Sequence, residues 1–317
     1  MSRLVVALGG NALLRRGEPA EAEVQRRNLA RVAAGLANLA VGNELVITHG
    51  NGPQVGLLAL EADAYRAVRP YPLDVLGAES QGMIGYLVVQ ALRSETEASV
   101  VALLTEVVVD ADDPAFGVPT KPIGPVYTEE EARREAAEHG WSIAPDAGYY
   151  RRVVPSPLPE EIVELEAIEA LLRQDSIVVC AGGGGIPVVR DGDQLRGVEA
   201  VIDKDLTAAL LAERLDADRL LILTDVPCVE RGWRTPEATP IRRASPAELR
   251  SLEFAPGSMA PKVEAVCRFV EATGREAVIG ALTELGDVAA GRAGTSVALK
   301  RERSRIRDPI IPRTLSA

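Results

Sequence analysis

Lysine is rare in this chain, and the places where it occurs are the first sign of chemistry. Of the 35 basic residues four are lysines, and three of these have unusual neighbours. They are Lys121 in Thr-Lys-Pro, Lys204 in Asp-Lys-Asp and Lys262 in Pro-Lys. An ammonium group is a compact point charge that can follow a moving phosphoryl group, whereas a guanidinium prefers fixed, planar partners. The lysines therefore point to chemistry on an anionic group.

The run Asp203-Lys204-Asp205 has two interpretations. It follows the mainly apolar run 198–202 and precedes a helical pattern. Aspartates at the start of a helix commonly cap its free N–H groups. Alternatively, the two carboxylates hold the ammonium of Lys204 in place and balance its charge. We favour this second interpretation for Lys204 and Asp205, because the chain also carries several glycine-rich loops.

Glycine-rich loops follow three of the predicted strands. Their residues are Gly9, Gly10 and Asn11, then Gly50, Asn51 and Gly52, and finally Gly182, Gly183, Gly184 and Gly185. Backbone without a Cβ can approach a phosphate closely, and a helix that begins after the loop adds a positive dipole end. One such loop is more often a tight turn. Three at one edge of a parallel sheet predict an anion or nucleotide site.

Further candidates lie in two other places. Thr224-Asp225-Val226 follows an apolar run, where a nucleotide would lie against the end of a strand. His49 either contacts a ligand or supports its glycine-rich loop, whereas His139 ends a charged helix and is expected in solvent. The motifs G-x-x-x-x-G-K-[ST] and G-x-G-x-x-G are both missing from the sequence. Phosphoryl transfer would thus need another scaffold, and a nicotinamide-dependent oxidoreductase is disfavoured.

Short apolar runs alternate with amphipathic patterns along most of the chain. The runs predict strands over residues 4–8, 44–48, 100–105, 176–181, 219–224 and 276–279. Apolar spacings of three and four residues predict helices over 24–39, 54–67, 80–92, 160–173, 206–215 and 261–273. This alternation is typical of an α/β fold with a mainly parallel sheet covered on both faces.

Residues 112–159 interrupt the alternation. They are rich in proline and turn residues and contain one short charged helix, over 128–139. We interpret them as an inserted subdomain or lid, the alternative being an irregular crossover. The chain otherwise forms a single domain, 1–317, with an N-terminal lobe of about residues 1–175 and a C-terminal lobe of about 176–317.

Composition restricts the class of function. A net charge of −11 argues against a general binder of nucleic acid or of anionic membranes. Because no apolar run reaches membrane-spanning length and no leader is predicted, we expect a cytoplasmic protein. The cysteines Cys180, Cys228 and Cys267 are widely spaced and odd in number, which predicts reduced thiols.

Segments along nearly the whole chain resemble the carbamate kinase family of the amino-acid kinase superfamily. They are VALGGNAL at 6–13, ITHGNGPQVG at 47–56, SQGMIGY at 80–86, DPAF and PTKPIG within 113–124, RRVVPSP at 151–157, GGGGIPV at 182–188, GVEAVIDKDL at 197–206 and GSMAPKVE at 257–264. The resemblance covers about residues 4–300 in the expected order. It implies a three-layer αβα sandwich with a small protruding subdomain.

The resemblance also implies a reaction and a site. Phosphoryl transfer would run reversibly between ATP and carbamate, giving ADP and carbamoyl phosphate, in arginine or other nitrogen catabolism. Lys204, Lys121 and Lys262 would neutralise the phosphates, with Asp205 orienting the lysines. The phosphoryl-acceptor side would lie in the N-terminal lobe at Gly9, Gly10, Asn11, Gly50, Asn51 and Gly52. The nucleotide would lie in the C-terminal lobe at Gly182, Gly183, Gly184, Thr224, Asp225, Val226, Ser258 and Met259.

The resemblance further implies that Mg²⁺ is held mainly by the nucleotide, and that the protein forms a homodimer. Several positions differ from the family pattern: Glu106, the Tyr149-Tyr150 tip, Ala260 and residues 227–240. They keep two alternatives open. One is a related kinase that phosphorylates another small acid, and the other is a non-catalytic nucleotide-binding protein. Retention of the lysines and of Asp205 argues against the second.

Overall fold

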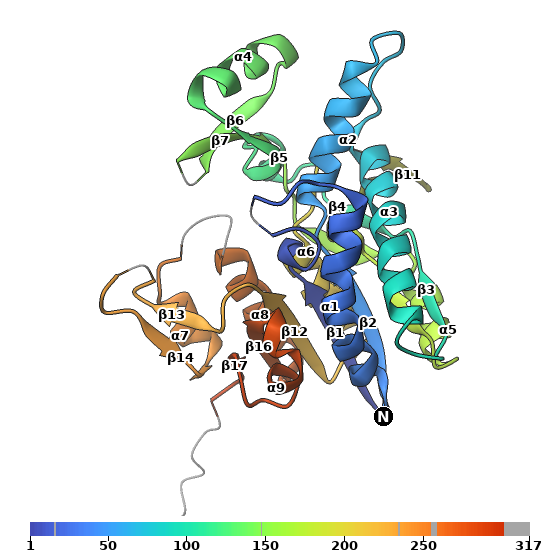
Figure 1. The fold of residues 1–317 in the computed structure, drawn as a ribbon, viewed down its shortest axis with the longest axis vertical. Helices are drawn as coiled ribbons and strands as arrows, with labels where there is room; N and C mark the ends of the chain where they lie inside the picture. The colour runs from blue at the N-terminus through green and yellow to red at the C-terminus, as the bar shows by residue number, and fades with distance from the viewer. Residues whose placement is uncertain (16, 147, 234, 255–258, 301–317) are drawn as a thin grey trace, which may run out of the picture.

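An eight-stranded sheet forms the centre of the molecule (Figure 1). The computed structural model describes residues 1–15, 17–146, 148–233, 235–254 and 259–300. The strand order is β15 (Arg243–Ala244), β17 (Thr295–Val297), β16 (Glu276–Ala281), β12 (Arg219–Thr224), β1 (Ser2–Leu8), β2 (Asn43–His49), β9 (Ile177–Val179) and β3 (Val100–Ala102). Neighbours from β16 to β3 are parallel, and β17 joins β16 antiparallel. The predicted α/β fold with a mainly parallel sheet is confirmed.

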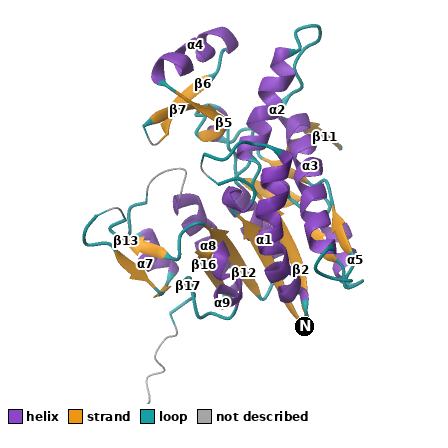
Figure 2. Cartoon of the chain, in the orientation of Figure 1, coloured by secondary structure: helices purple, strands orange, loops and turns teal. Residues whose placement is uncertain are grey.

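Helices cover both faces of this sheet. One face carries α1 (Ala22–Ala40), α3 (Leu73–Arg93) and α9 (Leu285–Ala289), and the other carries α5 (Leu165–Leu172), α6 (Lys204–Arg214) and α8 (Met259–Thr273). In Figure 2, α1 and α3 lie in front of the strands. Along β1, Leu4 and Val6 belong to the core on one face and Val5 to the core on the other, because successive side chains of a strand alternate.

A second, four-stranded sheet was not predicted. Its order is β11 (Gln194–Gly197), β10 (Ile186–Asp191), β4 (Glu106–Val109) and β8 (Pro159–Ile162). Two predictions are wrong because of it. The strand predicted over 100–105 ends at Ala102, since the chain turns at Thr105 to enter β4. The helix predicted over 160–173 begins only at Leu165, since the residues before it pair antiparallel with the open edge of β4.

The other predicted strands and helices are present, and their ends differ by a few residues. The largest difference is in α3, which begins at Leu73 rather than at residue 80. Two short strands, β13 (Val229–Arg231) and β14 (Thr239–Ile241), and the helix α7 (Pro246–Arg250) complete the C-terminal part. In the described part of the chain, no helix is both long and apolar enough to cross a membrane. All three cysteines are buried and form no disulfide.

Residues 121–146 and 148–154 stand away from the large sheet (Figure 1). They form a three-stranded sheet in the order β5 (Lys121–Tyr127), β7 (Tyr149–Val154) and β6 (Ser142–Asp146), with α4 (Glu129–His139) packed against it. The helix α4 begins with a capping box between Thr128 and Glu131 and ends at the left-handed Gly140, both of which are strong boundary signals in the sequence.

The base of this protruding sheet is anchored on α2 (Gly52–Ala64). A small core that includes Val55, Ile123, Val154 and Val201 joins the two. Next to it the backbones of Gly56 and Gly124 meet, so that a Cβ built on Gly56 would lie 1.9 Å from the Cα of Gly124. Lys121 therefore begins a strand whose root is held firmly on the body of the protein.

We expect Gly56→Ala to lower the free energy of unfolding by about 1–3 kcal/mol, because the added methyl must push β5 away from α2. Gly286→Ala is the matched control. It adds the same methyl to α9, where no described atom outside the local helix lies within 4 Å, and it should be neutral or slightly stabilising. Urea denaturation of both variants measures the difference. Equal stability of Gly56→Ala and wild type would contradict a tight contact.

Candidate active site

Loops from four strands meet at the carboxyl edge of the large sheet. Because β12, β1, β2 and β9 are parallel, the chain leaves all four at the same edge. Gly9 donates its N–H to the carbonyl of Leu223 (2.9 Å), and Gly50 donates to that of Leu8 (3.2 Å). A Cβ on Gly50 would lie 3.4 Å from the N of Gly10 and 3.6 Å from the Cδ of Lys204. The first two glycine-rich loops thus contact each other and Lys204.

The second and third glycine-rich loops interlock. A Cβ on Gly182 would lie 2.3 Å from the imidazole Cε1 of His49, and one on Gly183 would lie 2.1 Å from the Nδ2 of Asn51. A Cβ on Gly184 would lie 2.4 Å from the carbonyl oxygen of Ile202. These glycines are therefore required by close packing of the protein itself, a reason that the sequence did not reveal.

His49 is buried inside this contact. Its Nδ1 lies 3.1 Å from the carbonyl oxygen of Gly50, which fits an N–H donor in the neutral imidazole. Burial, assisted by the charge of Lys204, lowers the pKa of His49 from 6.5 to about 4. These contacts favour the supporting role over the ligand role. The prediction for His139 is wrong: its side chain is 12% exposed and lies 3.1 Å from a carboxylate oxygen of Asp63.

The three predicted lysines come together around two aspartates. Asp205 binds Lys204 with Oδ1 and Lys262 with Oδ2, the latter at 3.0 Å. Asp203 binds Lys121 with Oδ2, while its Oδ1 accepts the N–H of Asp205 at 2.9 Å. The capping interpretation therefore holds for Asp203. Of the two aspartates only Asp205 pairs with Lys204, while Asp203 pairs with Lys121 instead. We call these five residues the lysine–aspartate cluster.

Burial makes the charges of this cluster depend on one another. Burial alone would raise the pKa of Asp205, but Lys204 and Lys262 hold it well below its ordinary value. Burial lowers the pKa of Lys204 against the pull of Asp205. Burial would lower the pKa of Lys262 too, but the carboxylates of Asp205, Asp203 and Asp225 together raise this pKa above its ordinary value. The cluster thus holds its two most buried ammonium groups around one ionised carboxylate, beside loops that can donate N–H groups to an anion.

Other predicted residues surround the cluster less directly. Asn51 caps α2 with its backbone, while its Nδ2 donates to the Oγ of Ser80 at 2.8 Å. Ser80 begins the family-like segment 80–86 but was not among the predicted site residues, and it donates in turn to the carbonyl of Gly77 at 2.7 Å. Thr224 ends β12 and donates to the exposed carboxylate of Asp225 (3.1 Å), and the half-buried Val226 follows in the same loop.

Four predicted site residues, and Glu106, which differs from the family pattern, lie outside the lysine–aspartate cluster or outside the described residues. Gly52 begins α2 and Met259 begins α8. Ser258 and the side chain of Asn11 lie outside the described residues. Glu106 lies in β4, where its N–H donates to Glu164 at 2.8 Å, and no described ion pair joins it to a lysine of the cluster.

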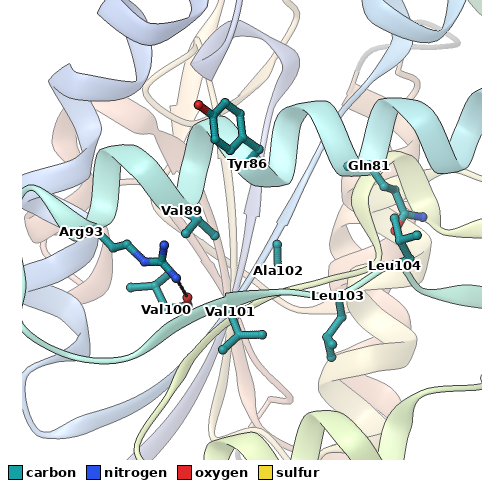
Figure 3. Close-up of a pocket in the computed structure, with 10 residues that line it drawn as sticks. Gln81, Tyr86, Val89, Arg93, Val100, Val101, Ala102, Leu103 and Leu104 are labelled. Carbon is teal, nitrogen blue, oxygen red and sulfur yellow. Dashed lines mark hydrogen bonds between the residues drawn. The ribbon is translucent and has the colours of Figure 1, made fainter.

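A separate open cavity of about 450 Å³ lies between α3 and the edge strand β3 (Figure 3). Val89 and Arg93 of α3 point toward the strand, and Arg93 donates to the carbonyl of Val100 at 3.1 Å, whereas the ring of Tyr86 lies along α3 and points away from the strand. It contains no member of the lysine–aspartate cluster, and its lining is largely apolar. We therefore regard it as a surface of the sheet edge rather than as the active site.

A model of the amino acid kinase family matches residues 2–281. The chain belongs to the amino acid kinase family. Within that family it is similar to "Carbamate kinase" of Haemophilus influenzae, with 56% identity over 95% of this chain and 98% of that protein. It is 53% identical to "Carbamate kinase" of Escherichia coli K12, over 94% of this chain and 100% of that one. The resemblance predicted from the sequence segments is confirmed.

Solved structures agree with this family membership. Carbamate kinase from Giardia lamblia bound to AMP-PNP has a TM-score of 0.84 and 41% identity, over 94% of this chain and 98% of that one. The same enzyme bound to citric acid has a TM-score of 0.88 with the same coverage. The three-layer arrangement is therefore that of the amino acid kinase fold.

The buried His49 gives a prediction about pH. The pKa of His49 is about 4 in the folded protein, whereas that of a free histidine is 6.5. Below about pH 6.5 the unfolded chain therefore takes up a proton at His49 that the folded protein does not. This contribution lowers the free energy of unfolding as pH falls from about 6.5 to about 4, by roughly 3 kcal/mol in total.

The variant His49→Asn retains an N–H near the position of Nδ1 and should lack this part of the pH dependence. Chemical denaturation at a series of pH values measures it, with His139→Asn as the matched control. If the free energy of unfolding depends on pH in the same way in His49→Asn and wild type, His49 is not held neutral in the folded protein.

Proposed function

We propose that this protein is a carbamate kinase, which transfers a phosphoryl group reversibly between ATP and carbamate and gives ADP and carbamoyl phosphate. The observation that carries the proposal is the lysine–aspartate cluster, where three ammonium groups converge beside the glycine-rich loops. Its position at the carboxyl edge of a parallel sheet is the usual place for a ligand. The relatives named carbamate kinase support the choice of substrate.

The roles of the residues follow from charge and position. In phosphoryl transfer, charge spreads over the oxygens of the group in flight, so catalysis depends on positioning and on preorganised positive charge. Lys204 and Lys262 would supply that charge, with Asp205 fixing both, and Lys121 would approach from the root of the protruding sheet. Carbamate already carries a nucleophilic oxygen, so the reaction needs no general base.

The two substrates would approach the cluster from the two lobes. Gly9, Gly10, Asn11, Gly50, Asn51 and Gly52 would hold carbamate or carbamoyl phosphate. Gly182, Gly183, Gly184, Thr224, Asp225, Val226, Ser258 and Met259 would hold the nucleotide. The glycines of the third loop would do so through backbone N–H groups, since their Cα atoms are packed against His49, Asn51 and Ile202.

Mg²⁺ would arrive as a complex with ATP or ADP and belong to the substrate. All four carboxylate oxygens of the cluster already contact lysines or backbone N–H groups, so the phosphates would be its main ligands. We also propose a cytoplasmic location and a role in arginine or other nitrogen catabolism.

A second candidate function is phosphorylation of a different small acid. It is motivated by Glu106, by the Tyr149-Tyr150 tip and by residues 227–240, which differ from the expected pattern. Glu106 lies in β4 beside Glu164, so it favours this alternative less than the sequence suggested.

The test is formation of ATP from ADP, Mg²⁺ and carbamoyl phosphate by the purified protein. We expect robust turnover by wild type and a decrease of about 100- to 1,000-fold in kcat for Lys204→Ala, because a preorganised cation is lost at the transferring group. Lys300→Ala is the matched control: that side chain is 71% exposed and pairs with Glu248, and its removal should leave kcat unchanged.

Failure of well-folded wild type to form ATP would reject the proposed substrate. A screen of other small carboxylic acids with ATP would then test the second candidate. Equal activity of Lys204→Ala and wild type would instead reject the cluster as the active site.

We propose in addition that the protein is a homodimer that associates through the cavity of Figure 3. Three large apolar side chains are exposed there or beside it: Met83 and Tyr86 on α3, and Leu104 after β3. The strand β3 has one neighbour, β9, in the described sheet, so its other edge is open to a second strand.

Tyr86→Glu should convert the dimer to a monomer, because it places a charge within the buried contact. Light scattering coupled to size-exclusion chromatography measures the mass. Tyr65→Glu is the control, since Tyr65 is similarly exposed at the end of α2. A monomeric wild type, or a dimer that tolerates Tyr86→Glu, would contradict this interface.

A further inference from the structure

We infer that Asp203 is a positioning residue for the reaction: it holds the ammonium of Lys121 at the site, in addition to capping α6. The expected effect of Asp203 on turnover rests on the proposed function, whereas its expected effect on the position of the Lys121 side chain does not. Asp203 and Lys121 are far apart in sequence, and neither the triplet nor the family resemblance pairs them.

The carboxylate of Asp203 divides its two oxygens between two tasks. Oδ1 accepts the N–H groups of Asp205 (2.9 Å) and Leu206 (3.4 Å), which fixes the plane of the carboxylate on the first turn of α6. Oδ2 is then directed at the Nζ of Lys121. The side chain of Asp203 is 9% exposed and that of Lys121 is 25% exposed, so the pair is shielded from competing solvent.

The backbones on both sides of this pair are tied together. Thr120 donates to the carbonyl of Val154 (3.2 Å), and Val201 donates to that of Pro155 (2.9 Å). Val154 also faces Lys121 across β5 and β7. The Cα of Lys121 is therefore fixed relative to the loop that precedes α6. What remains free without Asp203 is the flexible four-carbon side chain of the lysine.

Charge balance explains why a second aspartate is needed. Both oxygens of Asp205 are occupied by Lys204 and Lys262, so Asp205 has no oxygen left for a third lysine. Without Asp203, the ammonium of Lys121 would be repelled by the other two and would turn toward solvent. Asp203 thus lets a third cation remain beside two others before the anionic substrates arrive.

The variant Asp203→Asn separates the two tasks. Asparagine caps helices as well as aspartate does, so α6 should be retained, but its amide cannot hold an ammonium. We expect kcat for ATP formation to fall about 10- to 100-fold, while KM for carbamoyl phosphate stays constant or decreases, because a negative charge has been removed. A purely structural role would lower the melting temperature and leave kcat per folded enzyme unchanged.

A double-mutant comparison tests whether Asp203 acts through Lys121. In a Lys121→Ala background, Asp203→Asn should change kcat by less than about twofold, since the group that it positions is already gone. Independent, multiplicative losses would overturn the inference. Asp203→Ala, which removes the cap as well, should lower the melting temperature in both backgrounds.

A second readout needs no substrate. With four lysines in the chain, reductive ¹³C-methylation gives few NMR signals, and Lys121→Arg assigns the one from Lys121. In wild type this signal should be separate from that of the exposed Lys300. In Asp203→Asn it should move to the position of Lys300.

An unmoved Lys121 signal would overturn the inference even if the enzyme is active. A different pair of results separates the two proposals. If the Lys121 signal moves in Asp203→Asn but the wild type forms no ATP from carbamoyl phosphate, the proposed substrate is rejected and the role of Asp203 is retained.

Discussion

Two ammonium groups share one buried carboxylate, that of Asp205, and the rest of the site depends on this arrangement. Neither lysine could be desolvated alone, because an uncompensated buried charge costs several kcal/mol. The carboxylate in turn stays ionised because both lysines are present. The two lysines come from two helices, α6 and α8, that pack against each other on the same face of the sheet. The position of these helices is therefore set by electrostatics as well as by their apolar faces.

The glycine-rich loops serve this arrangement in two different ways. Gly50 lies close to the Gly10 backbone and to Lys204, and a Cβ there would reach ordinary contact distance from both. Gly182 and Gly183 must be small because His49 and Asn51 fill the space beside them. The loops thus form a packed layer over the cluster, in which a shift of one loop moves the next. Such packing is how a site made of loops can keep its geometry without a ligand.

The sequence predicted the large sheet well, because β1, β2 and β12 are continuous apolar runs that suit burial on both faces. It did not predict the second sheet, since β8 (PEEI) looks like the start of a helix until β4 is placed beside it. Lysine usage and the family resemblance identified all three lysines of the cluster. The partners could not be predicted, because the pairing of Lys121 with Asp203 depends on how the protruding sheet is anchored, through contacts such as Gly56 with Gly124.

The first turn of α6 has a consequence for how such a chain can vary during evolution. Asp203, Lys204 and Asp205 are consecutive, and each differs in direction by about 100°, since a helix has about 3.6 residues per turn. One caps the helix, and the other two meet across the cluster. Inserting or deleting a single residue just before the turn would rotate Asp203 away from Lys121 and Asp205 away from Lys262, which are their partners outside α6. We therefore expect length variation among relatives to collect in outlying loops, and the spacing of this turn to be invariant.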